Sequence, residues 1–321
     1  MVRAADTAYP TGRRLARLSR GRALTVVAAW YLVAGGAAGL TALALPGHHP
    51  IATTFGADVV ATVVVIAGSI AVANSSLYDP YWSVAPPVVA VAWAVQAPAG
   101  LAAGIRVRQV VVVALVAAWA VRLTGNWVLS WRGMAHEDWR YVDLRRSTAG
   151  RLPWWLVSGA GIQLTPTLVV FAGMLPLWPA LARPRHGLGI LDAAAFAVTA
   201  GAIGLEAAAD VQLRRFAADP ASAGRTMDRG TWAWSRHPNY LGEIGFWCGL
   251  WLFGVAAAPA DWWTAAGPLV MIVLFEAASI PLMERRSLRR RRDYVPYQRR
   301  VPRLLPRPRL RRWRTTPKPV P

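Results

Sequence analysis

Long apolar runs recur along the whole chain, and they limit more than any other feature what it can fold into. Crossing roughly 30 Å of hydrocarbon takes about 20 residues of helix. Backbone groups in lipid must hydrogen-bond within their own segment, so runs of this length should be transmembrane helices. The sequence therefore predicts an all-α, polytopic transmembrane bundle of about eight spans. The predicted spans cover residues 24–45, 51–73, 84–96, 107–131, 152–178, 190–209, 239–258 and 262–283, and the third is the shortest.

The composition agrees with this fold class, because 55% of the residues are hydrophobic and only 16% are charged. No polar interval is long enough to form a second, soluble domain. We expect a basic N-terminal tail over residues 1–23 and one integral-membrane domain over residues 24–306. A disordered tail rich in Pro and Arg should follow over residues 307–321.

Basic residues gather at alternate ends of the predicted spans. The two ends of the chain and the connections at residues 131–152 and 210–238 hold nearly all of the 36 Lys and Arg residues. This asymmetry predicts a multi-pass protein of the cell membrane with both termini in the cytoplasm. It also accounts for the net charge of +20, so we expect no nucleic-acid partner. The basic C-terminal segment should instead bind anionic lipid headgroups.

The first polar cluster, NSSLYDPYWS at residues 74–83, connects the second and third predicted spans on the cytoplasmic side. Asp79, flanked by Tyr78 and Tyr81, is a candidate to donate a proton to a reacting carbonyl group. The alternative is a capped turn with aromatic residues at the membrane interface. Both interpretations remain open.

The second cluster starts inside a predicted span. Asn126 follows Arg122 at a spacing of four residues, which places both on one helix face. Arg122 either reaches the interface with its long side chain or forms a polar stripe toward the bundle interior. Arg132 follows at the end of the span. The third cluster, GLEAAADVQLRRF at residues 204–216, carries Asp210 and Gln212 at the end of the sixth span.

The fourth cluster, WAWSRHPNYLGE at residues 232–243, is the densest group of polar side chains at the mouth of a span. Pro238 is tolerated in the first turn of a helix, and a helix N-terminus favours phosphate. The pattern predicts a site for a polyphosphate nucleotide, although neither a GxGxxG nor a Walker sequence is present. The five His residues are scattered, so we expect no metal. The candidate cofactor residues in clusters three and four are Asp210, Gln212, Arg225, Arg236, His237, Asn239, Tyr240 and Glu243.

These strings together resemble bacterial membrane proteins of unknown function that are related to the steroid 5α-reductase family. The resemblance covers about residues 74–306. It rests on five strings in order: NSSLYDPYWS, RLTGNW with EDWRY, EAAADVQL, SRHPNYLGE, and IPLMERR followed by DYVPYQRRVPRLLP. The known relatives use NADPH to reduce an activated carbon–carbon double bond in a lipid such as a steroid or sterol.

The resemblance implies an NADPH-dependent oxidoreductase of lipid metabolism, with a lipid substrate that enters from the bilayer. By position it assigns Asp210, Arg225, Asn239 and Glu243 to the NADPH site. Arg122 and Arg132 match basic residues that contact the cofactor. The Glu and Tyr that polarise the substrate carbonyl in the steroid enzymes have no clear match, so Asp79 with Tyr78 or Tyr81 is the expected substitute.

Two other interpretations stay open. RHPNYLG and a basic C-terminal segment with Glu284 also resemble isoprenylcysteine and phospholipid methyltransferases, which bind S-adenosylmethionine. Those enzymes usually carry two adjacent Glu residues, whereas Glu284 is followed by Arg285. A transporter or assembly factor without enzymatic activity is the other interpretation, with Asp58, Glu206 and Glu276 as a proton path.

Overall fold

A computed structural model describes residues 17–306, and all the regular elements in that range are helices. The predicted all-α class is therefore confirmed. The predicted disordered tail at residues 307–321 and residues 1–16 of the basic N-terminal tail lie outside the described residues. The chain divides into two compact units, Met1–Ile203 with Ile244–Leu274, and Gly204–Glu243 with Phe275–Pro321.

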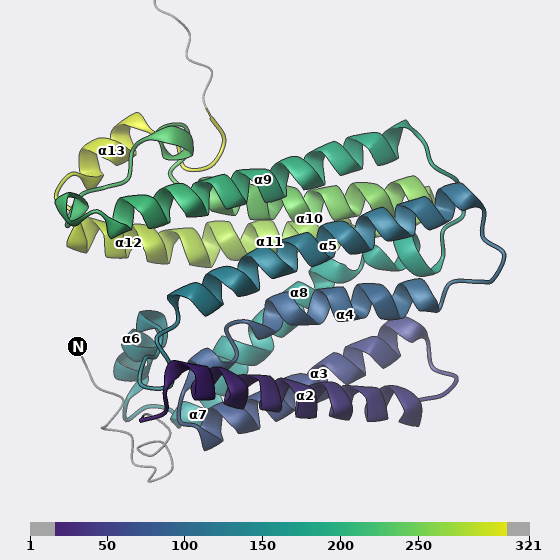
Figure 1. Cartoon of the computed structure of the whole chain (residues 1–321), viewed down its shortest axis with the longest axis horizontal. Coiled ribbons are helices and arrows are strands. Elements are labelled where there is room, and N and C mark those ends of the chain that lie inside the picture. Colours follow the sequence, from purple (N-terminus) through teal and green to yellow (C-terminus); the bar gives the residue numbers. More distant parts are fainter. Residues whose placement is uncertain (1–16, 307–321) are drawn as a thin grey trace, which may run out of the picture. The chain divides into compact units, whose positions relative to one another are not determined.

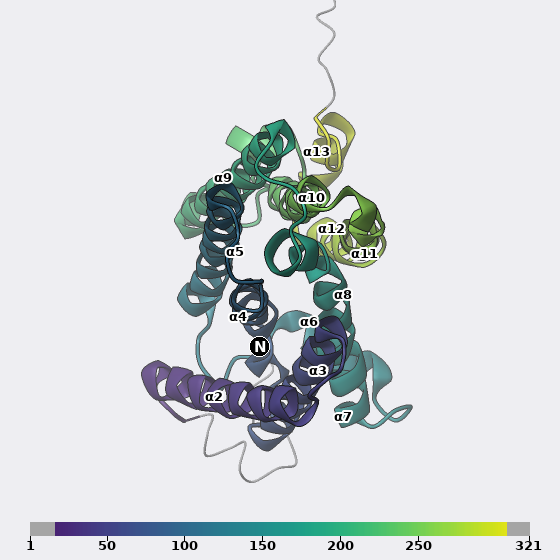
Figure 2. The same ribbon diagram turned by 90° about the vertical axis from the view of Figure 1, so that its right-hand side faces the viewer.

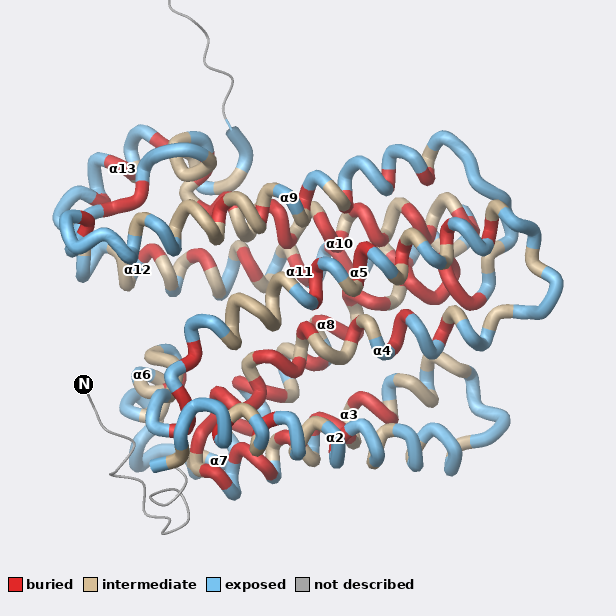
Figure 3. The backbone as a smooth tube through the Cα atoms, in the orientation of Figure 1, coloured by how far each residue is buried: buried red, intermediate tan, exposed pale blue. Residues whose placement is uncertain are grey.

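The first unit begins with two long helices, α2 (Arg20–Ala44) and α3 (Pro50–Ala71), which pack against each other (Figure 1). The Ser19 side chain caps α2 by accepting from the backbone N–H of Arg22. Pro50 starts α3 at the first helical position, where its missing N–H costs no helical hydrogen bond. Most of α2 is exposed or half-buried (Figure 3), and its leucines suit contact with lipid.

α4 (Tyr81–Val95) and α5 (Ala103–Ser130) lie side by side in both ribbon views (Figures 1 and 2). α4 contains Pro86 and Pro87 and has only 15 residues. Seven helical stretches in residues 17–306 are long and apolar enough to cross a membrane, and α4 is not among them. The predicted third span is thus a helix, but a shorter one than a full crossing requires.

The remaining elements of the first unit complete its bundle. α8 (Thr165–Met174) packs closely against α11 (Ala266–Val273), as a Cβ atom on Gly267 would lie 2.5 Å from the carbonyl oxygen of Ala172. Small residues at such crossings let helices approach in lipid. Trp119, fully buried, stacks on Phe246 with 4.7 Å between ring centroids. These elements are α6 (Trp139–Thr148), α7 (Trp154–Leu156), η3 (Val157–Leu164), α8 (Thr165–Met174), η4 (Trp178–Ala182), η7 (Pro259–Ala265) and α11 (Ala266–Val273).

The second unit contains the C-terminal part of α9 (Ile190–Ala218) and the first turns of α10 (Pro238–Ala257). The end of η8 (Leu274–Ser279) leads into α12 (Ile280–Arg290), and α13 (Tyr294–Arg300) follows. Tyr294, Tyr297 and Val301 form its small buried cluster. Two short turns, η5 (Pro220–Ser222) and η6 (Gly230–Ala233), join α9 to α10.

Candidate functional sites

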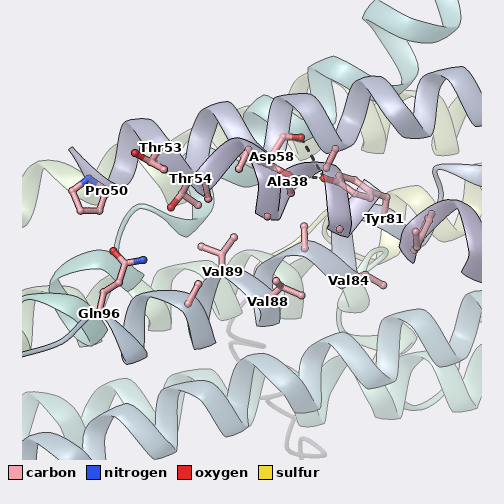
Figure 4. A pocket seen from close by; sticks show the side chains of 18 of the residues that line it. Ala38, Pro50, Thr53, Thr54, Asp58, Tyr81, Val84, Val88, Val89 and Gln96 are labelled. Atoms are coloured by element: carbon pink, nitrogen blue, oxygen red, sulfur yellow. Dashed lines mark hydrogen bonds between the residues drawn. The ribbon is translucent and has the colours of Figure 1, made fainter. Parts of the chain in front are cut away.

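An apolar cavity of about 530 Å³ lies among α2, α3 and α4 in the first unit (Figure 4). Small-molecule sites have volumes of roughly 300–1,000 Å³. Where α2 forms the wall, four small residues lie on one helix face and leave the cavity wide: Gly35, Ala38, Gly39 and Ala42. A Cβ atom built on Gly35 or Gly39 would meet no atom within 4 Å. The cavity can therefore hold a sizeable apolar ligand.

A carboxylate and a phenol form a hydrogen-bonded pair on the cavity wall. The hydroxyl of Tyr81 donates to Oδ1 of Asp58 over 2.7 Å, as the dashed line in Figure 4 marks. Both side chains are buried, and the ring of Tyr31 meets that of Tyr81 edge to face. A carboxylate in an apolar wall needs such a partner, because its transfer from water is costly. The pair gives the cavity one polar end.

The segment between α3 and α4 turns back alongside α3 to bring Tyr81 to this depth. Along the axis of α3, Asp58 lies about 20 Å before Ala71, the last residue of the helix. Tyr81 reaches Asp58, so residues 72–80 run back past the end of α3. NSSLYDPYWS therefore connects the second and third predicted spans, and its residues 81–83 already belong to α4.

Buried polar side chains hold this returning segment in place. Tyr78 hydrogen-bonds Thr167 over 2.8 Å, and Ser75 hydrogen-bonds Ser158 over 2.8 Å. Irregular backbone within an apolar bundle requires such partners. Ser158 lies in η3, whose π-helical turns are frequent at functional sites. Further links are Thr62 to Thr167 at 2.9 Å, Ser69 to Gln163 at 3.2 Å and Gln163 to Ser158 at 3.1 Å.

Of the three predicted catalytic residues, only Tyr81 lines the cavity. Asp79 accepts a hydrogen bond from the hydroxyl of Tyr141 in α6. Burial raises the pKa of the Asp79 carboxyl to about 6, against the opposing effects of the Arg140 cation and the Tyr141 hydrogen bond. Tyr78 is buried against Thr167. Asp79 and Tyr78 thus anchor the returning segment.

Asp58 was missed as the partner of Tyr81. The sequence pattern indicates this carboxylate only as part of a proton path in the nonenzymatic interpretation. A single Asp within an apolar run gives no sign of which distant residue it faces. The three predicted cofactor residues of the first unit lie elsewhere: Arg122 and Asn126 are half-buried on α5, and Arg132 is exposed just after it.

A smaller pocket, of about 100 Å³, lies in the second unit at the N-terminus of α10. Four of the predicted cofactor residues line it together: Arg236, His237, Asn239 and Tyr240. The others on its wall are Leu213, Thr226, Met227, Trp232, Met283, Ser287, Arg291, Tyr294 and Tyr297. Guanidinium, amide, imidazole and hydroxyl groups therefore meet at one place, as the sequence pattern predicted for these four residues.

Glu284 contacts several side chains of this pocket. In the sequence it indicated only the methyltransferase interpretation. Its Oε1 atom accepts from Nε of Arg236 at 2.8 Å and lies 3.2 Å from Nε2 of His237. Gln298 donates to the other carboxylate oxygen over 3.1 Å. Arg236 also donates to the carbonyl oxygens of Gln298 and Val301. Much of the donor capacity of Arg236 is thus used inside the unit.

The phenols of the pocket are hydrogen-bond donors at neutral pH. Burial raises the pKa of Tyr294 to about 12, with the nearby Glu284 carboxylate acting in the same direction. Tyr297 donates to the carbonyl oxygen of Trp232 over 2.7 Å. With Arg291 and Asn239 on the same wall, the pocket offers donors to a phosphate or to ribose oxygens.

The remaining candidates of the second unit do not line the pocket. Gln212 accepts from the backbone N–H and the hydroxyl of Thr231, at 3.0 and 2.8 Å, and so fixes the η6 turn. Burial acts to raise the pKa of Asp293, but hydrogen bonds from Thr226 lower it overall, and the charge of the exposed Arg225 adds to that lowering. The last two are Asp210, half-buried in α9, and Glu243, buried in α10. Residues 17–306 contain no group of three metal-ligating side chains.

These features define a class: a polytopic helical membrane protein with an apolar cavity in one unit and a donor-lined pocket in the other. The chain belongs to the family described as "Protein of unknown function (DUF1295)", which it matches over residues 64–301. It is also similar to an uncharacterized protein of Schizosaccharomyces pombe, C594.04c, with 29% identity over 261 residues covering 73% of each chain. No solved structure matches the chain.

Proposed function

We propose that the protein is a membrane-embedded reductase of an activated carbon–carbon double bond in an apolar, enone-like lipid related to steroids, sterols or isoprenoids. The observation that carries this proposal is the Asp58 and Tyr81 pair on the wall of an otherwise largely apolar cavity. The resemblance to steroid 5α-reductases supports NADPH as the hydride donor. It also supports a place in bacterial lipid metabolism.

Tyr81 and Asp58 supply the polarising groups in this proposal. A substrate carbonyl that accepts the Tyr81 hydrogen gains negative charge as its β-carbon becomes saturated, and an oriented donor stabilises that charge. In the empty cavity the single Tyr81 hydrogen goes to Asp58, 2.7 Å away. A substrate carbonyl can accept that hydrogen when Asp58 is protonated, because the Asp58 carboxyl then donates to the phenol oxygen in turn. The surrounding Gly, Ala and Val residues offer no competing hydrogen-bonding side chain, so a bound substrate would meet the pair in apolar surroundings.

NADPH supplies a hydride when it is bound. The second-unit pocket fits a phosphate or ribose part of it by its donor set, since Asn239, Arg291 and Tyr294 point to one space. A volume of about 100 Å³ holds such a part and not a whole dinucleotide. Arg236 and His237 contribute to this pocket through the carboxylate of Glu284.

The first experiment is titration calorimetry of the detergent-purified protein with NADPH and, in parallel, with S-adenosylmethionine. We expect NADPH to bind and Asn239→Ala to weaken its binding by about tenfold, the loss of a charge-assisted hydrogen bond. Binding of S-adenosylmethionine without NADPH would instead establish the methyltransferase alternative, which the Arg236, His237 and Glu284 cluster at RHPNYLG favours.

The second experiment tests the catalytic pair by NADPH oxidation with an enone lipid. Tyr81→Phe should lower kcat by about 10²-fold, because it removes the donor to the developing enolate. Thr41→Val is the control, because this hydroxyl bonds its own helix and does not line the cavity. Equal kcat in wild type and Tyr81→Phe would remove Tyr81 from the mechanism.

A further inference from the structure

The cavity has a second polar end, opposite the pair of Asp58 and Tyr81. His48, Thr53 and Gln96 line it there, from the start of α3 and the end of α4. Figure 4 shows the Gln96 amide pointing toward Pro50 and Thr53, at the far end from Tyr81. We call His48, Thr53 and Gln96 the distal group.

The wall between the two ends is apolar. It consists of Gly, Ala, Val and Pro residues, together with Thr54. The hydroxyl of Thr54 already accepts from Nε1 of Trp93 over 3.0 Å. A ligand in the middle of the cavity therefore meets hydrocarbon, and its hydrogen-bonding groups belong at the ends.

Helix geometry gives the separation of the ends. The Tyr81 hydroxyl lies at Asp58, which is about 8 Å along α3 from Thr53, whereas the α4 backbone from Tyr81 to Gln96 covers about 22 Å. Asp58 lies about 12 Å along α3 from Pro50. A lipid that fills the cavity with its carbonyl at Tyr81 thus brings its other end to the distal group.

Gln96 and His48 are exposed and Thr53 is half-buried. An apolar ligand end against them would cover part of their polar surface without replacing the hydrogen bonds to water that it displaces. Covering polar groups in this way is unfavourable, whereas a hydroxyl or carboxyl on the ligand would satisfy them. His48 adds an imidazole that can donate or accept.

We propose that the substrate is an elongated lipid with oxygen functions at both ends, and that the distal group selects it. The carbonyl of the reacting end lies at Asp58 and Tyr81, and a hydroxyl or carboxyl of the other end binds His48, Thr53 and Gln96. This inference rests on the proposed function for the identity of the reacting end. It makes the distal group a specificity determinant that is separate from the catalytic pair.

The test compares the binding of two ligands by titration calorimetry in detergent: cholestenone, and its derivative with a hydroxyl at the end of the side chain. We expect the wild type to bind the hydroxylated ligand about 2- to 10-fold more tightly, the effect of one hydrogen bond. The double variant Thr53→Val with Gln96→Leu keeps only the exposed His48 of the distal group and should bind both ligands almost equally. Thr41→Val, whose hydroxyl bonds its own helix, is the matched control and should keep the preference.

Equal affinities in the wild type, or a preference that survives in the double variant, would overturn the inference. The proposed function would stand in either case if Tyr81→Phe still weakened both ligands. Failure of the wild type to bind either ligand would overturn the inference together with the proposed lipid cavity.

Discussion

Single residues decide whether the cavity of the first unit is open. Gly35 and Gly39 present no side chain to it, and Gly36 lies on the same helix but does not line it. The backbone needs no glycine at these positions, since none of the three has a positive φ angle. Their role is to leave space, and the space can be filled without disturbing the neighbours.

Gly39→Leu should therefore abolish lipid binding while the fold is retained. The new side chain enters the cavity, since a Cβ atom at this position meets nothing within 4 Å. Gly36→Leu is the matched control, with the same gain in helix propensity of about 1 kcal/mol. Calorimetric titration with cholestenone checks both variants, and normal binding by Gly39→Leu would show that the lipid lies elsewhere.

Glu284 should matter for the second unit through the charge that it compensates. Arg236 is nearly buried and pairs with it at 2.8 Å, so Glu284→Ala leaves an uncompensated guanidinium. Removing one partner of such a pair costs about 3–5 kcal/mol. Glu284→Gln keeps an oxygen acceptor and should be milder. Thermal unfolding in detergent measures both variants, and equal losses would contradict a role for the charge.

At the scale of elements, hydropathy predicted most helices but not the course of the chain between α3 and α4. The apolar runs at residues 24–45 and 51–73 correspond closely to α2 and α3, because length and hydropathy alone set such spans. The return of residues 72–80 depends on hydrogen bonds between distant residues, such as Ser75 with Ser158. The residues next to each position in the sequence do not indicate which distant residue it will hydrogen-bond.

The same limit applied to the sites. Arg236, His237, Asn239 and Tyr240 were found together because they are neighbours on one helix start, which is a local pattern. Asp58 was not connected with Tyr81, because their pairing follows from the tertiary fold.

The stability that the contact between the returning segment and α6 provides should depend on pH, because Asp79 titrates there. Burial raises the pKa of Asp79 to about 6, with Arg140 and Tyr141 opposing the rise and Asp138 adding to it. An unfolded Asp has a pKa near 3.9. Since the folded value is higher, the contribution of Asp79 to stability is present below about pH 4 and is lost as the pH rises through about 6.

Asp79→Asn should remove this dependence. The variant stays neutral and can still accept from Tyr141, so it should be more stable than wild type above pH 6, by up to about 3 kcal/mol. Thermal unfolding at pH 4.5 and pH 7.5 measures the effect. A variant that is less stable than wild type at pH 7.5 would show that the charged carboxylate is favoured there.

At the scale of the whole molecule, seven helical stretches of residues 17–306 are long and apolar enough to cross a membrane. α4 covers about 22 Å, less than the roughly 30 Å of hydrocarbon. An eighth crossing by α4 would place both ends of the chain on one side of the membrane, as the distribution of basic residues predicts.

The distribution of basic residues predicts on which side of the membrane individual residues lie. Ala99, exposed between α4 and α5, should face the exterior, and Ala149, exposed after α6, should face the cytoplasm beside Arg145, Arg146 and Arg151. In a Cys248→Ser background, a membrane-impermeant maleimide applied to intact cells should label Ala99→Cys and leave Ala149→Cys unlabelled until the cells are opened. Labelling of both positions on intact cells would mean that α5 does not cross the membrane. The reverse pattern would mean that the basic connections lie outside, and the donor-lined pocket could then not draw a nucleotide from the cytoplasm.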